Sequence, residues 1–180
     1  MHSPLWIDGK PVTGAHNARV TLPFDGSPVA ESSLAGPVEL EHALCAAERA
    51  SHVMRELSRY ERAEILRRTR DGLLQASADM AELITKESGK PLREARAEVQ
   101  RAAMTLLFAS EEASRLHGEE VPIDAAPGGA GRHGLLVREP VGVVAAITPF
   151  NFPLNLALHK IARRWRRATA WCTKWHPPRP

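Results

Sequence analysis

The sequence predicts an α/β fold, and three observations support this assignment. Residues 5–34 hold turn-forming residues between short β-branched runs, which is typical of β-hairpins. Residues 37–117 carry apolar residues at helical spacing in four segments. Residues 141–147 form an apolar, β-branched run, and a short turn joins this run to a further helical pattern. Strand, tight turn and helix in that order are typical of the opening of a dinucleotide-binding unit.

Two hairpins are expected near the N-terminus. Residues 5–12 have Asp8-Gly9 at their centre, a pair that favours a two-residue hairpin turn. Residues 20–22 and 29–34 are expected to form a second strand pair around a turn rich in Pro and Gly.

The first two of the four expected helices meet near residue 58. Pro37 suits the first turn of one helix, which runs to about residue 57. Ser58 and Glu61 have the spacing of a capping box for the next helix. The arginines of this second helix are expected on a solvated outer face, in preference to an anion site, because acidic residues are mixed with them. They are Arg59, Arg62, Arg67 and Arg70.

The other two helices are separated by a glycine. Ser77 is predicted to cap a helix over residues 78–88, which Gly89 ends. The fourth helix is expected over residues 92–117, with small and aliphatic residues along one face.

In the first helix, Cys45 is expected to be a buried, inert thiol.

The segment after these helices should project as a hairpin and then enter the core. Residues 121–123 and 135–137 are the expected strands, on either side of a Pro- and Gly-rich loop. Residues 141–147 are expected to be a fully buried strand of the parallel type. Pro153 suits a first helical position, and the helix that follows has an apolar face at helical spacing.

Composition bounds the kind of protein. A chain of 180 residues with 43% apolar and 25% charged residues is typical of one globular domain. No apolar run is long enough to span a bilayer, and no secretory signal is visible, so no membrane partner is expected. Two cysteines make no disulfide framework, which favours a cytoplasmic setting. No metal site is expected, because no His, Cys and carboxylate residues have ligand spacing.

Two blocks of the sequence carry a resemblance to a known family. Residues 138–144 read Arg-Glu-Pro-Val-Gly-Val-Val, and residues 147–154 read Ile-Thr-Pro-Phe-Asn-Phe-Pro-Leu. Residues 87–91 read Glu-Ser-Gly-Lys-Pro, and Glu94, Ala95, Glu98 and Val99 follow. Both blocks resemble signatures of the aldehyde dehydrogenase superfamily. The block has phenylalanine before Asn151, where many members have tryptophan. In this it is similar to members that act on lactaldehyde, semialdehydes and glyceraldehyde phosphate.

The resemblance implies an oxidoreductase that converts an aldehyde to a carboxylic acid with NAD or NADP. It implies that the Asn151 amide helps hold the oxyanion of a thiohemiacetal, whereas the residues alone also fit an ordinary turn asparagine. Positions that would line the cofactor are Ile147, Thr148, Pro149 and Phe150. The block around Gly89 is interpreted as structural, the end of one helix and the start of the next.

The resemblance also implies a domain organisation. Residues 1–162 match part of an NAD(P)-binding domain, and residues 119–140 include a protruding hairpin that pairs subunits of homo-oligomers. The strand, the helices and the hairpins would then form the truncated N-terminal part of the family's fold, with the first strand and helix of its Rossmann-like cofactor domain. The family's nucleophilic cysteine and general-base glutamate have no match here, and Cys172 lacks the family's cysteine motif. The chain alone is therefore expected to be inactive.

After residue 162 the resemblance stops. Residues 163–180 hold six basic residues and no acid, and the rest of the chain carries 18 basic and 21 acidic residues. Residues 163–169 can be written CGG CGC TGG CGG CGG GCA ACG. Read one base earlier, from a C that ends codon 162, these letters encode Pro-Ala-Leu-Ala-Ala-Gly-Asn, which is the family's continuation. The tail is therefore interpreted as a frameshift product, either disordered or a ragged extension of the helix. The strand at residues 141–147 would then lack a neighbour.

Two other functions stay open at this point. A helical, non-catalytic interaction module would bind a full-length relative through its helices and hairpin. A basic, tryptophan-rich tail could also bind nucleic acid through phosphate contacts and stacking. The frameshift interpretation disfavours this, and no nucleic-acid partner is expected.

Overall fold

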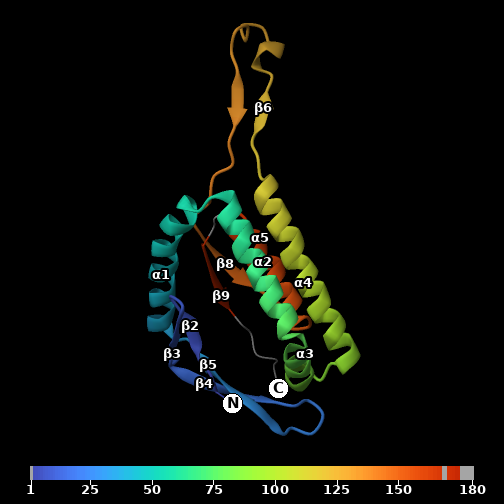
Figure 1. The fold of residues 1–180 in the computed structure, drawn as a ribbon. Helices are drawn as coiled ribbons and strands as arrows, with labels where there is room; N and C mark the ends of the chain where they lie inside the picture. The colour runs from blue at the N-terminus through green and yellow to red at the C-terminus, as the bar shows by residue number, and fades with distance from the viewer. Residues whose placement is uncertain (1, 168–169, 175–180) are drawn as a thin grey trace.

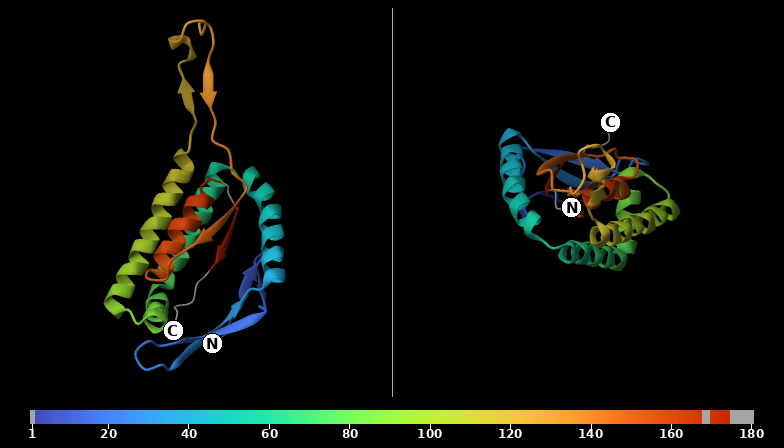
Figure 2. Two further views of the ribbon diagram at one scale, coloured as in Figure 1. Left: turned by 180° about the vertical axis from the view of Figure 1, so that it is seen from behind. Right: turned by 90° about the horizontal axis from the view of Figure 1, so that it is seen from above.

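The computed structural model describes residues 2–167 and 170–174. Small β-sheets lie at one end of the molecule, a helical core fills the middle, and a long hairpin projects from the other end (Figure 1). A pair of strands lies between the first helix and the helical core, as a view from behind also shows (Figure 2).

The N-terminal hairpins form as predicted. Strands β2 (Leu5–Ile7) and β3 (Lys10–Val12) pair antiparallel. Asp8 and Gly9 between them both have positive φ angles, 54° and 69°, as a two-residue hairpin turn with right-handed strand twist requires. Strand β5 (Pro28–Leu34) pairs with β4 (His16–Thr21), and β1 (His2–Ser3) adds to its other edge in parallel.

Helix α1 (Pro37–Glu56) begins and ends where the sequence predicts, and helix α2 (Arg59–Gln75) begins where it predicts. The capping box before α2 is confirmed. The Glu61 N–H donates to Ser58 Oγ at 3.1 Å, and the Ser58 N–H donates to Glu61 Oε2 at 2.7 Å. The hydrogen bonds that Ser58 donates to the Glu61 carboxylate, from its side chain and its backbone N–H, lower the pKa of that carboxyl.

Helices α3 (Ser77–Ser88) and α4 (Leu92–Arg115) confirm the expected break at Gly89, whose φ of 71° is left-handed. The prediction that Ser77 caps α3 is wrong. Ala76 is the capping residue and makes no side-chain hydrogen bond, because α2 runs almost directly into α3 and leaves no extended residue there.

Two further expectations about side chains are wrong. Arg62 does not face solvent: the side chain is buried, and Nη1 donates to the backbone carbonyl of Leu57, which no other helical N–H reaches. Cys45 is exposed and not buried, because the inward face of α1 passes through Ala46 and Ala47.

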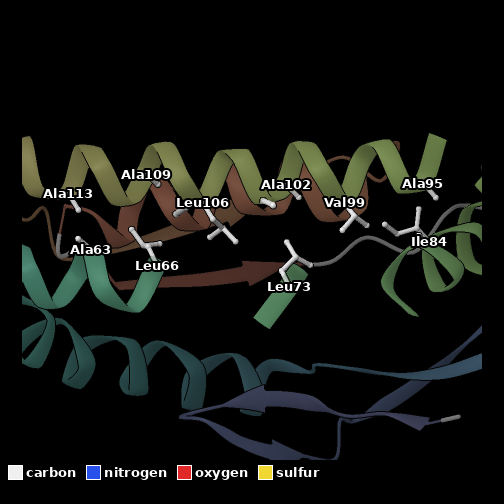
Figure 3. Close-up of a cluster of buried hydrophobic side chains, with 13 residues drawn as sticks. Ala63, Leu66, Leu73, Ile84, Ala95, Val99, Ala102, Leu106, Ala109 and Ala113 are labelled. Atoms are coloured by element: carbon white, nitrogen blue, oxygen red, sulfur yellow. The ribbon is translucent and has the colours of Figure 1, made fainter. Parts of the chain in front are cut away.

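The hydrophobic core lies between α2 and α4, with α3 at one end, and the last helix packs along its side (Figure 1 and Figure 3). Its contacts come from one continuous stripe of α4 that meets shorter stripes of α2 and α3. The α4 residues are Ala95, Val99, Ala102, Ala103, Leu106, Ala109 and Ala113, and the α2 and α3 residues are Ala63, Leu66, Leu73, Ala81 and Ile84. Small side chains dominate the α4 stripe, so the helices can approach closely.

The projecting hairpin consists of β6 (Glu119–Val121) and β7 (Gly134–Leu136), which pair antiparallel. Between them, a short 3-10 helix, η1 (Ile123–Ala125), takes the place of part of the first predicted strand. The Arg138 side chain donates to Glu119 Oε1 at 2.6 Å across the base of the hairpin. The hairpin extends well beyond the helices (Figure 1).

Strand β8 (Val143–Ile147) and helix α5 (Pro153–Trp165) follow, as predicted. Leu154 and Leu158 of α5 pack against the core. The expectation of full burial is wrong for β8, where Ala146 is buried but Ile147 is 59% exposed. A two-stranded sheet leaves more of each strand uncovered than the larger parallel sheet that the sequence pattern indicates.

The expectations for the tail are also partly wrong. Residues 163–165 extend α5, but Ala170–Lys174 form strand β9, which pairs with β8 in parallel and gives it a neighbour. The order strand, helix, parallel strand satisfies the backbone groups along one edge of β8. Residues 168–169 and 175–180 lie outside the described part of the chain. No helix in the described residues is long and apolar enough to cross a membrane.

Candidate functional site

The candidate site is the turn that joins the carboxyl end of β8 to the first turn of α5. Ile147 ends the strand, Thr148 and Pro149 follow without regular structure, and Phe150 and Asn151 form a bend. Phe150 is 54% exposed, and Asn151 is also exposed. All five predicted site residues therefore lie at a strand end, where open α/β sheets bind their ligands.

A buried ion pair lies beneath this turn. The side chain of Glu98 in α4 is 0% exposed, and that of Lys90 is 11% exposed. Lys90 Nζ bonds to Glu98 Oε2 and also donates to the backbone carbonyl of Asn151 at 3.0 Å. The cation thus joins the Gly89 break to the candidate site, although the two segments are 61 residues apart.

The second oxygen of Glu98 caps α5. Its Oε1 accepts the backbone N–H groups of Leu154 at 3.1 Å and Asn155 at 3.2 Å. Phe152, at the N-cap position of α5, has no side chain that could accept these bonds. The carboxylate also lies at the positive end of the α5 dipole, which stabilises its charge.

Two further contacts hold the start of α5 against α4. The ring of Phe152 contacts two cations, with Lys90 Nζ 4.1 Å and the Arg101 guanidinium carbon 5.3 Å from its centre. Thr105 Oγ1 donates to Asn155 Oδ1 at 3.1 Å. Helix α4 therefore supplies most of the contacts that determine the conformation of the turn.

The Asn151 side chain is the group of this turn that could bind a reacting oxygen. Within the described residues, no hydrogen bond engages its amide, although the backbone carbonyl of the same residue is held by Lys90. An unengaged amide on a held backbone is a hydrogen-bond donor available to a ligand oxygen, and it is most useful where negative charge develops on that oxygen.

The residues around the turn that sequence reasoning missed are Lys90, Glu98, Arg101 and Thr105. The block with Lys90 and Glu98 was interpreted as only a helix stop and restart. Glu98 carried a usable signal: it lies on the apolar stripe of α4 between Ala95 and Ala102. A carboxylate on a buried helix face requires a buried cation or several N–H donors.

Hollows elsewhere on the described surface do not involve this turn. One is lined by Ser77, Arg96 and Gln100, among others, and a second by Leu116, Arg138 and Glu139, among others. No group of three or more His, Cys, Asp or Glu within the described ranges could hold a metal ion.

Comparison with known proteins gives a consistent result. Residues 8–165 match the aldehyde dehydrogenase family. The chain is 43% identical over 157 residues to a 3-sulfolactaldehyde dehydrogenase of Priestia aryabhattai, and the match covers 87% of this chain and 32% of that protein. It is 40% identical over 142 residues to aspartate-semialdehyde dehydrogenase 1 of Pseudomonas canavaninivorans, with 79% and 30% covered.

Solved structures agree. The NADP-dependent glyceraldehyde-3-phosphate dehydrogenase of Bacillus halodurans C-125, complexed with NADP, superposes with a TM-score of 0.92 at 30% identity, over 96% of this chain and 37% of that one. Aldehyde dehydrogenase 21 of Physcomitrella patens, in complex with succinate, has a TM-score of 0.92 at 32% identity, over 96% and 36%. The chain thus spans about a third of the length of the curated relatives and solved structures it matches.

Proposed function

The chain belongs to the aldehyde dehydrogenase family, and on that premise we propose that it provides the oxyanion-binding and cofactor-binding turn for oxidation of a small aldehyde to its acid. The observation that carries the proposal is the exposed, unengaged Asn151 amide on a turn held by a buried ion pair. The residues on both sides of Asn151 lie at the strand end where a nicotinamide cofactor would bind.

Asn151 would donate its side-chain N–H to the substrate oxygen. When a thiolate attacks an aldehyde, the carbonyl oxygen becomes an alkoxide in the resulting thiohemiacetal. A preorganised amide stabilises that charge more than it stabilises the neutral carbonyl, and loss of such a donor costs about 3–4 kcal/mol of barrier. Because Lys90 holds the backbone of Asn151, little reorganisation is needed when the charge appears.

Ile147, Thr148, Pro149 and Phe150 would line the nicotinamide end of NAD or NADP. These residues fit an apolar ring and ribose, because two of them are exposed hydrophobic side chains directly at the strand end. A bound nicotinamide cofactor supplies a hydride acceptor there. The chain's own contribution would be to orient that ring and to exclude water from one of its faces. NADP is bound in the similar Bacillus halodurans structure.

A chimera tests this function. Residues 8–162, which exclude the 163–180 tail, replace the matching segment of the Priestia aryabhattai relative, which is 43% identical. We expect the chimera to be active and its Asn151→Ala variant to lose roughly 100- to 1,000-fold in kcat, with a nearly unchanged KM for the cofactor. Asn17→Ala, on the exposed strand β4, is the control. An Asn151→Ala chimera as active as its parent would contradict the proposed role.

The 180-residue chain by itself is proposed to lack dehydrogenase activity. Its two cysteines lie in α1 and β9, and neither has the sequence surroundings of the family's nucleophile. Aldehyde-dependent NADH or NADPH formation by the pure, intact protein would disprove this statement.

We also propose that residues 163–180 are a frameshift product, translated out of the family's reading frame. The support is that residues 163–169 can be encoded by codons which, read one base earlier, give seven family-like residues after residue 162. The genomic DNA across codon 162 tests it: a single-base shift should restore a family-like reading frame downstream. A gene whose downstream DNA encodes nothing similar in any frame would exclude the idea.

The β6–β7 hairpin is proposed to contact a second subunit. Leu135 and Val137 are 79% and 73% exposed on this projecting arm, and Val121, which pairs with Gly134, is 43% exposed on the other strand. Exposed apolar strands of this kind favour pairing with another chain. Leu135→Lys should shift the sedimentation of the chimera toward a smaller species, whereas Arg132→Lys at the exposed hairpin tip should not.

A further inference from the structure

We propose that the Lys90–Glu98 ion pair is a positioning device for Asn151, which fixes the direction of the side-chain amide as well as stabilising the fold. The inference rests on the proposed function of Asn151 and extends it to two residues that touch neither substrate nor cofactor. Lys90 and Glu98 are thus positioning residues, because they act only through the backbone between residues 151 and 155.

The first argument comes from the backbone N–H groups at the start of α5. The first helical residue is Pro153, which has no N–H. Leu154 and Asn155 donate to Glu98, and Leu156 donates to the carbonyl of Phe152 at 3.0 Å. Every donor of the first turn is therefore satisfied, and two of the three by one carboxylate from another helix. The start of α5 is thus determined by Glu98 and not by a local cap.

The second argument comes from the other end of the turn. Lys90 Nζ holds the carbonyl oxygen of Asn151, and the same ammonium group lies over the ring of Phe152. Rotation of the peptide plane after Asn151 would break the first contact, and movement of Phe152 would break the second. Lys90 thus holds the backbone of Asn151, while the Asn151 side chain stays exposed.

The third argument concerns charge. Glu98 has 0% exposure and uses both oxygens, one for Lys90 and one for two N–H groups. Buried charges need further hydrogen bonds to satisfy their remaining lone pairs and protons. Here those partners are backbone groups of the turn and of the helix that follows it, and not other side chains or solvent. The pair therefore links two segments in a defined orientation.

Amide hydrogen exchange and NMR on the full 180-residue chain test this directly. The first variant is the charge-swapped double mutant Lys90→Glu/Glu98→Lys, which keeps opposite charges but places a donor where Oε1 accepted two N–H groups. We expect exchange at Leu154 and Asn155 to accelerate roughly 10- to 100-fold. We also expect the side-chain NH2 resonances of Asn151 to shift.

A milder variant keeps the test decisive if the swapped protein does not fold. Lys90→Arg retains the cation, but the planar guanidinium is wider than an ammonium and cannot occupy the same position between Glu98 and the Asn151 carbonyl. We expect a folded protein in which the Asn151 side-chain resonances shift. Glu112→Gln is the matched control, because the half-exposed Glu112 links α4 to the C-terminal end of α5 through an ion pair with Arg166, far from the start of α5. It should change neither readout.

Two results would overturn the proposal. One is a charge-swapped protein with parental exchange at Leu154 and Asn155, which would show a purely electrostatic pair. The other is a folded Lys90→Arg protein with unshifted Asn151 resonances. Both outcomes concern the turn alone, so they are distinguishable from failure of the proposed function, which the chimera with Asn151→Ala measures separately. In that chimera, Lys90→Arg should lower kcat while the KM for the cofactor stays nearly constant.

Discussion

The carboxylate of Glu98 accepts the backbone N–H of Leu154 at 3.1 Å, across 56 residues of sequence. This contact connects the most buried helix of the core to the first turn of the helix that follows the candidate site. The geometry of the site and the stability of the core therefore depend on the same helix, α4. Disturbance of either should be detectable in the other.

Removal of one partner of the ion pair should be costly. Lys90→Met leaves the Glu98 charge buried without its cation, so we expect a loss of about 3–5 kcal/mol in the free energy of unfolding. Lys90→Met/Glu98→Leu should lose less than the sum of the two single variants, because no unpaired charge remains. Urea denaturation of Lys90→Met, Glu98→Leu and the double variant measures the three losses in the free energy of unfolding. Strict additivity of the single changes would contradict the buried-pair interpretation.

Ser58 and Ser77 should behave differently when changed to alanine. Ser58→Ala removes the oxygen that accepts the Glu61 N–H and should cost about 1 kcal/mol. Ser77→Ala should be neutral or slightly stabilising, because Ser77 is the first helical residue of α3 and does not cap it. Thermal unfolding of both variants checks this pair. Equal losses would mean that Ser77 is a cap after all.

Glu87 should make the stability depend on pH. Burial raises the pKa of its carboxyl above the ordinary value of 4.5. The folded chain then holds this proton more tightly than the unfolded chain, so stability falls as pH rises from the unfolded to the folded pKa. Glu87→Gln should therefore be more stable than the parent at pH 7, and the difference should vanish below pH 4.5.

Glu61 is the control with the opposite sign. Hydrogen bonds from Ser58 lower its pKa, so its charged form contributes stability above the unfolded pKa, and this contribution is lost as pH falls through the folded pKa. Glu61→Gln should be less stable than the parent at pH 7 and should approach it in acid. Denaturation curves from pH 3 to pH 8 separate the two cases, and parallel pH profiles would contradict both assignments.

The core should be most sensitive along α4. Leu106 is 2% exposed and lies between α2 and α4 (Figure 3), so Leu106→Ala should cost about 2–5 kcal/mol. Met104 on the same helix is 45% exposed, and Met104→Ala should change stability by less than about 0.5 kcal/mol. Urea denaturation compares the two, and similar losses would place the core elsewhere.

Much of this fold was predictable because its signals are local. The Asp8-Gly9 pair, the Ser58–Glu61 box and Gly89 each determine a turn or a helix end through their own backbone chemistry. Errors arose where contacts between elements decide. Arg62 is polar but buried, at the end of α1 where it donates to the Leu57 carbonyl, and the tail at Ala170–Lys174 forms a strand because β8 offers an open edge.

The candidate site was predictable only in part for the same reason. Residues 147–151 stand out as one continuous block, and the structure places them at a strand end as expected. The contacts that hold this block come from Lys90 and Glu98, more than 50 residues earlier. No local pattern around Asn151 points to them. Only the presence of a carboxylate on the apolar stripe of α4 hints at such a partner.

The long arm formed by β6 and β7 has a practical consequence for work on this protein. The loop between its strands lies at the far end of the arm from the helical core (Figure 1). A small fluorophore attached to this loop would report on tumbling without touching the residues that determine stability. A bulky affinity tag there should weaken self-association, because the same arm is proposed to contact the second subunit.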